Sequence, residues 1–283
     1  MKELTIYSKE ELKKIQYLEK ELLKEVVRIC NSLNIEYFLI GGSALGAVRH
    51  NGFIPWDDDI DIGMTRNNYD RFLKEAPIML SSKYHLQTPY NTKNTPYPYT
   101  KIRIDNTLFV EYCNRKLNIH HGVYIDVFPF DKVPISNFLN LMHFKICRIL
   151  IYCFTLRQVI DVSQPPKNFT QKIKGFIREL IHMFFKLIPY KLLVILCDKF
   201  ITIFNSSKNS RLPLSCLFFP KRNTEYILPK DLYPLQLHKF EDFEANIPNN
   251  YNQYLTTHYG DWNKLPPEEK QFGHKPYIIK LEK

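Results

Sequence analysis

Four aspartates stand within five positions of the stretch GFIPWDDDIDIGM, residues 52–64, in a chain whose formal net charge is +10. They are Asp57, Asp58, Asp59 and Asp61. Alternate residues of a β-strand lie on the same face of the sheet. A strand over residues 59–62 would therefore place Asp59 and Asp61 on one face and two isoleucines on the other. We predict this strand, with the isoleucines buried and the two carboxylates side by side.

Two ionised carboxylates held this close repel each other, and burial increases the cost. A divalent cation relieves the repulsion, because Mg²⁺ is usually held by one or two carboxylates together with substrate phosphates. The pattern therefore predicts a site for Mg²⁺ or Mn²⁺, formed by Asp59 and Asp61 and more weakly by Asp57, that receives an anionic substrate. A solvated acidic loop is the simpler alternative, and the apolar alternation argues against it. A calcium loop fails because Gly63 and Asn68 do not fit its pattern.

A third carboxylate is expected from Asp126, in the stretch HHGVYIDVFPFD. It stands between two apolar residues in a strand predicted over residues 122–128. A buried aspartate needs a hydrogen-bonding partner or a metal ion, so Asp126 either completes the acidic site or bonds to the backbone. Asp131 is the weaker candidate, because we expect it at a turn after Pro129.

Gly41, Gly42 and Ser43 follow a buried strand predicted over residues 36–40 and precede a short helix predicted over residues 44–49. We interpret them as a tight turn. Glycines let a phosphate approach the backbone, and the N–H groups at a helix N-terminus favour an anion. This motif therefore predicts a second part of the anionic-substrate site.

The rest of the first half alternates helix and strand. Ser8 and Glu11 have the spacing of a capping box, and apolar residues then recur at helical spacing as far as residue 33. The further predicted elements are a helix over residues 67–80, strands over 101–104 and 107–112 joined by a two-residue turn at Asp105–Asn106, and mostly helical structure over 134–204 with a break at 163–167.

The positive net charge favours an anionic partner, which can be nucleic acid, an acidic lipid surface or a phosphorylated small molecule. No basic patch with interleaved aromatic residues stands out, so we expect no nucleic-acid partner. The six cysteines include no CxxC pair, and we interpret them as buried free thiols in a reducing compartment. The opening stretch MKELTIYSKEELKK lacks the apolar core of a signal peptide, so a cytoplasmic location is expected.

Two long apolar segments, residues 138–156 and 173–204, fall short of the uninterrupted apolar run that a membrane span needs, because basic residues break them. Two interpretations remain open. They are core helices whose lysines extend to solvent, or they form a surface that lies on an anionic membrane.

One stretch, GGSALGAVRHNGFIPWDDDIDIGM, closely resembles the signature of the LicD family of phosphotransferases, which includes the fukutin-type enzymes within the nucleotidyltransferase superfamily. Three further stretches are similar to that family: EYFLIGG with the helix that leads into it, HHGVYIDVFPFDKVP, and YGDWNKLPPEEKQFGH. The resemblance covers residues 10–135 and 240–275 and leaves 136–235 unmatched.

The resemblance implies an α/β (α+β) fold, with a nucleotidyltransferase-like mixed sheet flanked by helices. Three parts follow along the chain. Residues 1–135 would form the catalytic core, residues 136–235 a mostly helical region that faces the acceptor or a membrane, and residues 236–283 a segment that packs back on the core.

LicD-type proteins move phosphocholine from CDP-choline onto a sugar of a cell-surface glycan, and fukutin-type relatives move ribitol phosphate from CDP-ribitol. The resemblance thus implies a CDP-linked donor, a divalent metal, and a glycan acceptor, free or lipid-linked, in lipopolysaccharide, teichoic acid or capsule. It assigns metal binding and catalysis to Asp59, Asp61 and Asp126, with Asp57 as a weaker ligand. In this scheme CMP leaves, and Asp126 accepts the proton of the acceptor hydroxyl. A lipid-linked acceptor would be met at the inner membrane face.

Several side chains are candidates for contact with the donor. Arg49, Lys101 and Arg103 could bind its phosphates or be solvated surface cations. Trp56 could pack on a base or on choline or hold its own loop. His121 could touch substrate or make a structural hydrogen bond.

Other functions remain open. An enzyme of the same fold could transfer ribitol or glycerol phosphate, or could transfer a nucleotide from an NTP and release pyrophosphate in place of CMP. A non-catalytic binding module is a third possibility. The complete set Asp59, Asp61 and Asp126 argues against a module, because a degenerate relative would be expected to lose one of them.

Overall fold

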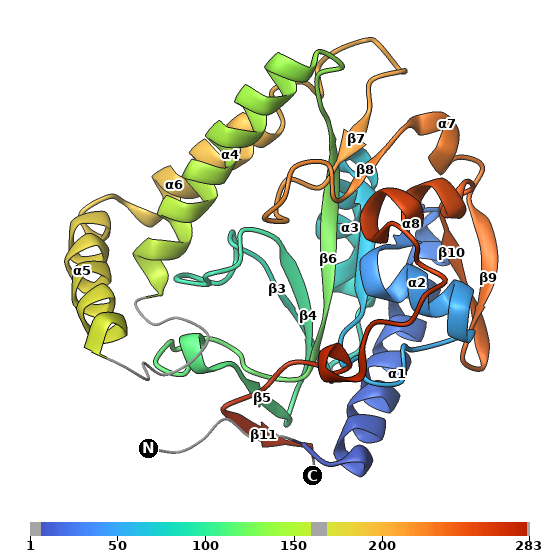
Figure 1. The fold of residues 1–283 in the computed structure, drawn as a ribbon, viewed down its shortest axis with the longest axis horizontal. Coiled ribbons are helices and arrows are strands. Elements are labelled where there is room, and N and C mark those ends of the chain that lie inside the picture. Colours follow the sequence, from blue (N-terminus) through green and yellow to red (C-terminus); the bar gives the residue numbers. More distant parts are fainter. Residues whose placement is uncertain (1–6, 160–168, 282–283) are drawn as a thin grey trace.

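A mixed sheet of seven strands lies at the centre of the computed structural model, which describes residues 7–159 and 169–281 (Figure 1). The strands follow the order β1-β2-β6-β4-β3, with β7 paired to β6 and β8 paired to β7. Among these described strands, β2 and β6 run parallel and the other pairs run antiparallel. The strands are β1 (Phe38–Leu39), β2 (Asp61–Thr65), β3 (Tyr84–Gln87), β4 (Thr100–Ile104), β6 (Tyr124–Lys132), β7 (Leu214–Ser215) and β8 (Tyr226–Ile227). Helices flank this sheet, so the predicted fold class is confirmed.

Helices α1 (Lys9–Leu33) and α3 (Arg66–Met79) pack against each other and against β6. The predicted capping box of α1 is present. Ser8 Oγ accepts from the Glu11 N–H at 3.1 Å, and the Glu11 carboxylate accepts from the Ser8 N–H at 2.7 Å. Six apolar residues of α1 are fully buried in the main core, so this helix is packed against the sheet that carries the acidic residues.

The glycines after β1 begin a helix and do not form a separate turn, which corrects the prediction. Helix α2 (Gly41–His50) contains all three residues of the Gly-Gly-Ser motif in its first turn. Gly41 has a φ angle of +52°, a conformation in which a side chain is strained. Its N–H donates to the hydroxyl of Tyr254 at 2.8 Å. The motif therefore fixes the helix start tightly against the C-terminal part of the chain.

Strand β2 starts at Asp61, two residues later than predicted, so the three preceding aspartates lie in a loop. The expected alternation is nevertheless present, since Ile60 and Ile62 are fully buried. The shift arises because β1 pairs with β2 only from Ile62 onward, leaving the acidic stretch without a strand partner on that side.

Strand β6 is nine residues long and continues through Pro129 and Asp131, where a turn was expected. Pro129 has no N–H to donate, and it stands between the end of the β4 pairing at Val127 and the start of the β7 pairing at Asp131. Asp131 is fully buried and accepts two hydrogen bonds from Arg66, both at 2.8 Å. It is therefore a structural ion-pair partner.

The turn at Asp105–Asn106 forms, but the strands beside it do not pair with each other. β4 pairs with β3 and β6, whereas β5 (Leu108–Val110) pairs with β11 (Ile278–Lys280) near the C-terminus. The predicted hairpin is wrong, because the returning C-terminal segment takes the edge of β5. Towards the C-terminus the chain also forms α7 (Pro229–Leu232), the hairpin of β9 (Gln236–Phe240) and β10 (Phe243–Ile247), and α8 (Tyr251–Tyr259). There are two short 3-10 helices among the described residues, η1 (Tyr112–Asn114) and η2 (Glu268–Lys270).

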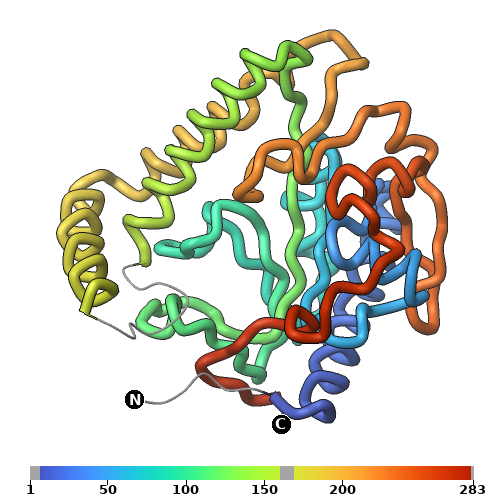
Figure 2. The backbone as a smooth tube through the Cα atoms, in the orientation of Figure 1, coloured from blue at the N-terminus to red at the C-terminus, as the bar shows by residue number. Residues whose placement is uncertain are grey.

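Three helices form a layer at the side of the sheet: α4 (Asn137–Gln158), α5 (Phe169–Lys186) and α6 (Tyr190–Ile201) (Figures 1 and 2). α4 and α6 share a second hydrophobic cluster, separate from the main core. By length and hydropathy α4 could cross a membrane, and α5 and α6 pass the same test as a pair bent by 92°. The predicted break at residues 163–167 lies outside the described residues. The division of the chain into three parts stays a prediction, although β7 and β8 join residues 136–235 to the sheet.

We expect Gly63→Ala to destabilise the fold by about 1–3 kcal/mol, the usual cost of overpacking a core. A Cβ at Gly63 would lie 2.6 Å from the Phe38 ring and 2.8 Å from Ile40 and from the Phe130 ring. Urea unfolding followed by circular dichroism measures the change. Gly175→Ala is the matched control, because nothing lies within 4 Å of its Cβ and the exposed helix should gain up to about 1 kcal/mol. Equal stability of Gly63→Ala and wild type would contradict the packing described here.

Candidate active site

Three charged side chains form a row across neighbouring strands. Asp61 of β2 is in register with Asp126 of β6, and Asp126 is in register with Lys101 of β4 on its other side. Neighbouring strands lie about 4.8 Å apart, and residues in register share a face. Lys101 Nζ donates to both carboxylate oxygens of Asp126, at 2.6 and 2.8 Å. The structure therefore brings together two of the predicted catalytic aspartates and one predicted phosphate-binding cation.

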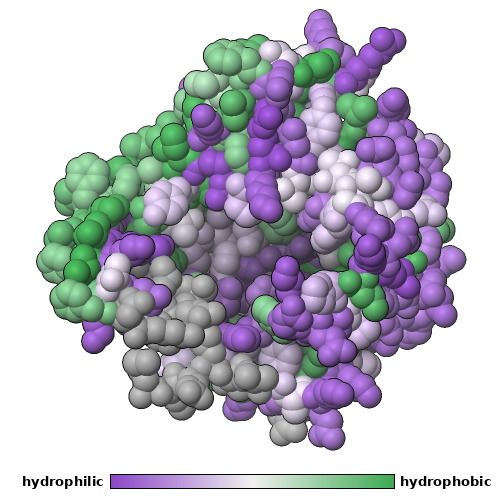
Figure 3. Space-filling model, in the orientation of Figure 1, coloured by the Kyte–Doolittle hydropathy of each residue, from purple (hydrophilic) through white to green (hydrophobic). Residues whose placement is uncertain are grey.

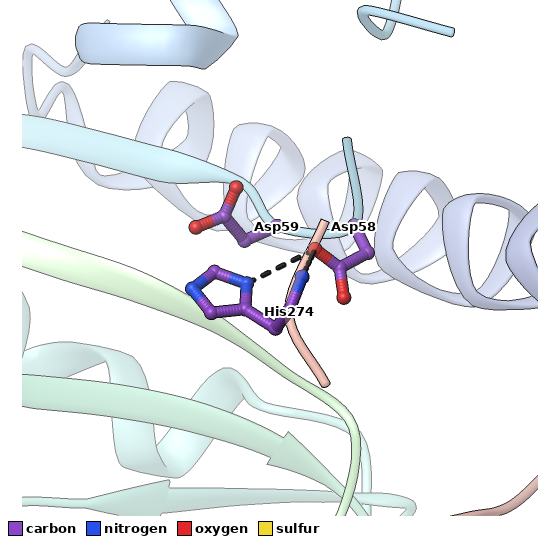
Figure 4. Close-up of side chains that lie close together, drawn as sticks. All are labelled: Asp58, Asp59 and His274. Atoms are coloured by element: carbon purple, nitrogen blue, oxygen red, sulfur yellow. Dashed lines mark hydrogen bonds and ion pairs between the residues drawn. The ribbon is translucent and has the colours of Figure 1, made fainter. Parts of the chain in front are cut away.

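The aspartates before β2 lie beside His274, which comes from the C-terminal segment (Figure 4). Asp58 Oδ1 accepts from the His274 backbone N–H at 2.9 Å and lies 3.0 Å from its Nδ1. Asp58, Asp59 and His274 offer ligand atoms within 4.8 Å of one another, the one such group found among the described residues. Figure 4 shows the imidazole beside both carboxylates. The metal-binding set predicted from the sequence shares Asp59 with this group.

The carboxylates of the site are costly to ionise. Desolvation, reinforced by the neighbouring carboxylates, raises the pKa of Asp57 to about 8. Desolvation also raises the pKa of Asp59, of Asp61 and of Asp126. Burial and mutual repulsion therefore both oppose ionisation of these carboxylates, and a bound cation would relieve both costs.

Two cations of the chain partly balance this charge. Burial lowers the pKa of Lys101, and the adjacent Asp126 opposes that change. The hydrogen bond with Asp58 raises the pKa of His274 to about 10. The Lys101 ammonium is also enclosed by three tyrosine rings, with centroid distances of 4.4, 5.5 and 3.4 Å to Tyr97, Tyr99 and Tyr124.

The start of α2 contacts the acidic loop and β2. Ser43 Oγ accepts from the Asp61 N–H at 2.8 Å. A Cβ at Gly42 would lie 2.7 Å from Asp57 Oδ2, so this carboxylate lies against the helix backbone. The N-terminus of a helix stabilises an anion. The glycines thus permit the close approach of a carboxylate of this chain, where the sequence suggested the approach of a phosphate.

Glu225 is a buried carboxylate that the sequence reasoning missed. It accepts from the Tyr254 hydroxyl, and His258 Nδ1 lies 2.7 Å from its Oε1. A Cβ at Gly41 would lie 3.5 Å from Asp61 Oδ2 and 3.7 Å from Glu225 Oε1, so Gly41 stands between the two carboxylates. Glu225 comes from residues 136–235, the part that carries no recognised motif, and nothing in its neighbourhood of the sequence distinguishes it.

Glu19 was also missed, although the sequence contains a signal for it. It occupies the apolar stripe of α1 between Ile15 and Leu22, where a charged residue is out of place. It is 2% exposed, and its Oε2 has no partner in the described structure. Desolvation and the carboxylates of residues 57–59 raise its pKa well above the ordinary value. Glu19 therefore adds a buried carboxylate from helix α1 to the acidic residues 57–59.

Arg103 and Lys101 are both buried, so the alternative of solvated surface cations is wrong for them. Arg103 donates to Gln87 Oε1 at 2.6 Å and to the Gly122 carbonyl at 2.9 Å. These bonds connect β4 with β3 and with the segment that leads into β6.

Three other predicted substrate contacts lie in structural interactions. Arg49 donates to the carbonyl of Trp262 at 2.8 Å. Trp56 makes an edge contact with His50, and His121 Nε2 lies 3.0 Å from the Leu117 carbonyl. Their contact with a donor stays a prediction.

A mixed sheet that holds aspartates on the adjacent strands β2 and β6, beside a Gly-Gly-Ser helix start, is consistent with a nucleotidyltransferase domain. Residues 34–145 match the family model described as the LicD/FKTN/FKRP nucleotidyltransferase domain. Residues 34–145 are therefore similar to a LicD-family domain, and the expected resemblance is confirmed.

Relatives extend the comparison beyond this domain. The chain is 27% identical over 274 residues to the lipopolysaccharide cholinephosphotransferase LicD of Haemophilus influenzae, covering 89% of this chain and 92% of that protein. A stretch of 45 residues is 44% identical to the human ribitol 5-phosphate transferase FKRP, covering 16% of this chain and 9% of that protein. A stretch of 67 residues is 36% identical to an uncharacterised Rickettsia typhi protein, covering 24% and 22%. The similarity supports an enzyme that transfers phosphate-containing groups.

The pKa shifts predict that the metal-free protein loses stability as the pH rises from about 6 to about 9. A raised folded-state pKa means that the folded protein binds the proton more tightly, so the stabilisation is present at low pH. It is lost as the pH rises through about 8 for Asp57 and through about 10 for His274. Metal ions compete with protons for the same ligands, so Mg²⁺ should raise the melting temperature more at pH 9 than at pH 6.

Differential scanning fluorimetry at constant ionic strength, with and without Mg²⁺, measures both effects. Sodium chloride of equal ionic strength is the control for simple screening of charge. A larger Mg²⁺ effect at the lower pH would contradict this account of the site.

Proposed function

We propose that this protein transfers a substituted phosphate from a CDP-linked donor to a sugar hydroxyl of a cell-surface glycan, and that the group is phosphocholine from CDP-choline. The similarity to a cholinephosphotransferase over 89% of the chain supports the donor. The observation that carries the chemistry is the row Asp61–Asp126–Lys101 beside the acidic loop. The reaction belongs in the cytoplasm, and the glycan is lipopolysaccharide, teichoic acid or capsule.

In the proposed reaction the acceptor oxygen forms a bond to the outer phosphorus of the donor. The bond from that phosphorus to the CMP oxygen breaks, and CMP leaves. The hydroxyl proton passes to a carboxylate oxygen of Asp126. The register of Asp126 with Asp61 supports this role. Lys101 holds Asp126 in position through both oxygens and places positive charge next to the phosphates.

The residues present fit a divalent cation. Oxygen ligands are those that Mg²⁺ prefers, and Asp58 Oδ2 and Glu19 Oε2 are buried oxygens without a hydrogen-bond partner among the described residues. We assign the cation to Asp59, Asp61 and Asp126, with Asp57 beside them. When bound, Mg²⁺ or Mn²⁺ would neutralise charge on the phosphates of the donor and of the leaving group. His274 orients Asp58 through the hydrogen bond at Oδ1, and so fixes the loop that carries Asp59.

The donor is identified by measuring melting temperatures with CDP-choline, CDP-ribitol, CDP-glycerol, CMP and ATP, each with Mg²⁺ or with EDTA. At a ligand concentration about 100 times its dissociation constant, binding stabilises by about 2.7 kcal/mol. We expect CDP-choline with Mg²⁺ to give the largest shift, and Asp61→Asn to lose it. Asp242→Asn is the control, because this exposed carboxylate pairs with Lys24 and is far from Asp61 along the chain.

Stabilisation by another CDP-alcohol would keep the reaction and change the transferred group. Stabilisation by ATP alone, with release of pyrophosphate, would replace the proposal with nucleotidyl transfer.

We expect Asp126→Asn to lower the rate of CMP release by about 10²–10⁴-fold, the usual contribution of a general base. An amide cannot accept the hydroxyl proton, and it also loses the ion pair with Lys101. The double variant Asp126→Asn/Lys101→Met separates these effects, because it removes both buried charges together. Activity that returns in the double variant would show that Asp126 acts through stability alone. Circular dichroism checks that each variant is folded.

A further inference from the structure

The layer of α4, α5 and α6 carries most of the exposed large apolar side chains of the described residues. Of the 28 exposed large apolar side chains among the described residues, 18 lie between Phe138 and Ile203. Figure 3 shows these hydrophobic residues gathered over the three helices, whereas polar residues dominate the opposite side of the view. Patches larger than several hundred Å² are rare on monomers and usually mark an interaction surface.

Helix α5 is the clearest part of this surface. His182 is the one residue of α5 that is buried, and its Nδ1 lies 2.8 Å from the Leu156 carbonyl. The large side chains Phe176, Leu180 and Phe184 are 62%, 47% and 64% exposed. Residues four apart lie on one face of a helix, so these three form a stripe. A globular protein would normally bury such a stripe, and here it faces outward.

Lysines border the apolar stripe of α5 on both sides. Successive residues are about 100° apart around a helix, so Lys172 and Lys174 flank Ile173 on opposite edges of the stripe. Within the bounds of the three helices, nine Lys and Arg residues stand against two Asp and Glu residues, a net charge of +7 out of the chain's +10. An apolar face bordered by basic residues is the arrangement of a helix that lies in a membrane interface.

We propose that the layer of α4, α5 and α6 binds the surface of an anionic lipid bilayer, with the apolar stripe of α5 inserted below the headgroups. The charge argues against a second copy of the chain as the occupant, because two faces of net charge +7 would repel each other. Anionic lipid headgroups supply the complementary charge, and each nearby Lys or Arg strengthens binding by about fivefold.

The helices lie on the bilayer and do not cross it. Although α4 is long and apolar enough to span a membrane, one side of it is buried against the protein through Cys147, Ile151 and Phe154. Arg148 donates to the Phe218 carbonyl at 2.8 Å. A spanning α4 would have to expose this packed side, whereas a flat orientation uses only the side already exposed.

This surface would bring the enzyme to a lipid-linked acceptor, a consequence that rests on the proposed function. Binding itself does not require donor, metal or acceptor. A vesicle experiment therefore succeeds or fails independently of the reaction proposed above.

The test is flotation of the full chain with vesicles of phosphatidylcholine alone or with about 30% phosphatidylglycerol. We expect wild type to float with the anionic vesicles, with at least roughly tenfold weaker binding to the neutral ones, and to be released by about 0.5 M salt. The variant Phe176→Ser/Leu180→Ser/Phe184→Ser should stay in the soluble fraction. All three positions are exposed, so the fold should be retained, as circular dichroism can check.

Two matched controls distinguish binding through this surface from nonspecific adsorption to vesicles. Tyr17→Ser/Ile78→Ser/Leu237→Ser removes three exposed apolar side chains elsewhere and should float like wild type. Lys172→Gln/Lys174→Gln should weaken binding by roughly 30-fold, whereas Lys13→Gln/Lys239→Gln should not.

Wild type that remains soluble with anionic vesicles would overturn the proposal. Equal flotation of the α5 variant and its control would overturn the assignment to this surface. Equal binding to neutral vesicles would overturn the role of anionic lipid. A dimer in light scattering that the α5 variant abolishes, without flotation, would identify a second copy of the chain as the occupant and overturn the proposal.

Discussion

The structure depends on a cluster of buried and half-buried carboxylates that are held close together. Two strands of the sheet, β2 and β6, place Asp61 and Asp126 side by side, and the pKa of each is raised by burial. Repulsion between such groups would push the strands apart unless cations lay among them. Lys101 supplies one within the sheet, and His274 supplies another from the far end of the chain. Removing one partner of a buried ion pair costs about 3–5 kcal/mol, so the fold and the site are coupled.

This coupling explains which parts of the site could be predicted from the sequence. The alternation of Asp59 and Asp61 with isoleucines is local, and a strand of period two converts it directly into a face of the sheet. Asp126 was identified by the same reasoning, as a charge in an apolar strand. The pairing that brings Asp61 next to Asp126 is not local, and the family resemblance supplied it. The position of β2, the helical start at Gly41 and the length of β6 differed from prediction, because pairing with distant strands decides where each element ends.

Two residues of the site depend on contacts between distant segments: Glu225, which the sequence did not indicate, and His274, which ends the stretch YGDWNKLPPEEKQFGH but could be given no role. Glu225 reaches the site because β7 and β8 attach residues 214–227 to the end of β6. His274 reaches Asp58 because the C-terminal segment pairs with β5 through β11 and returns across the acidic loop. Neither approach leaves a periodic pattern in the sequence. Glu19 is different, since a glutamate in the buried stripe of α1 breaks a pattern that the sequence displays. A charge in an apolar stripe therefore marks a residue whose partner, ion or site lies on the facing element.

The same strand connects the site to the exposed helical layer. β6 carries Asp126 near its start and ends at Lys132, and α4 begins five residues later at Asn137. Val133 packs in the cluster shared by α4 and α6, while Phe130 packs in the main core, so the two hydrophobic clusters meet along this short connection. A surface of net charge +7 thus follows closely along the chain from the strand that holds Asp126, the proposed general base. Seven of the chain's ten net positive charges lie in this layer, whereas four aspartates stand together at residues 57–61. The uneven distribution of net charge explains how four neighbouring aspartates occur in a basic protein.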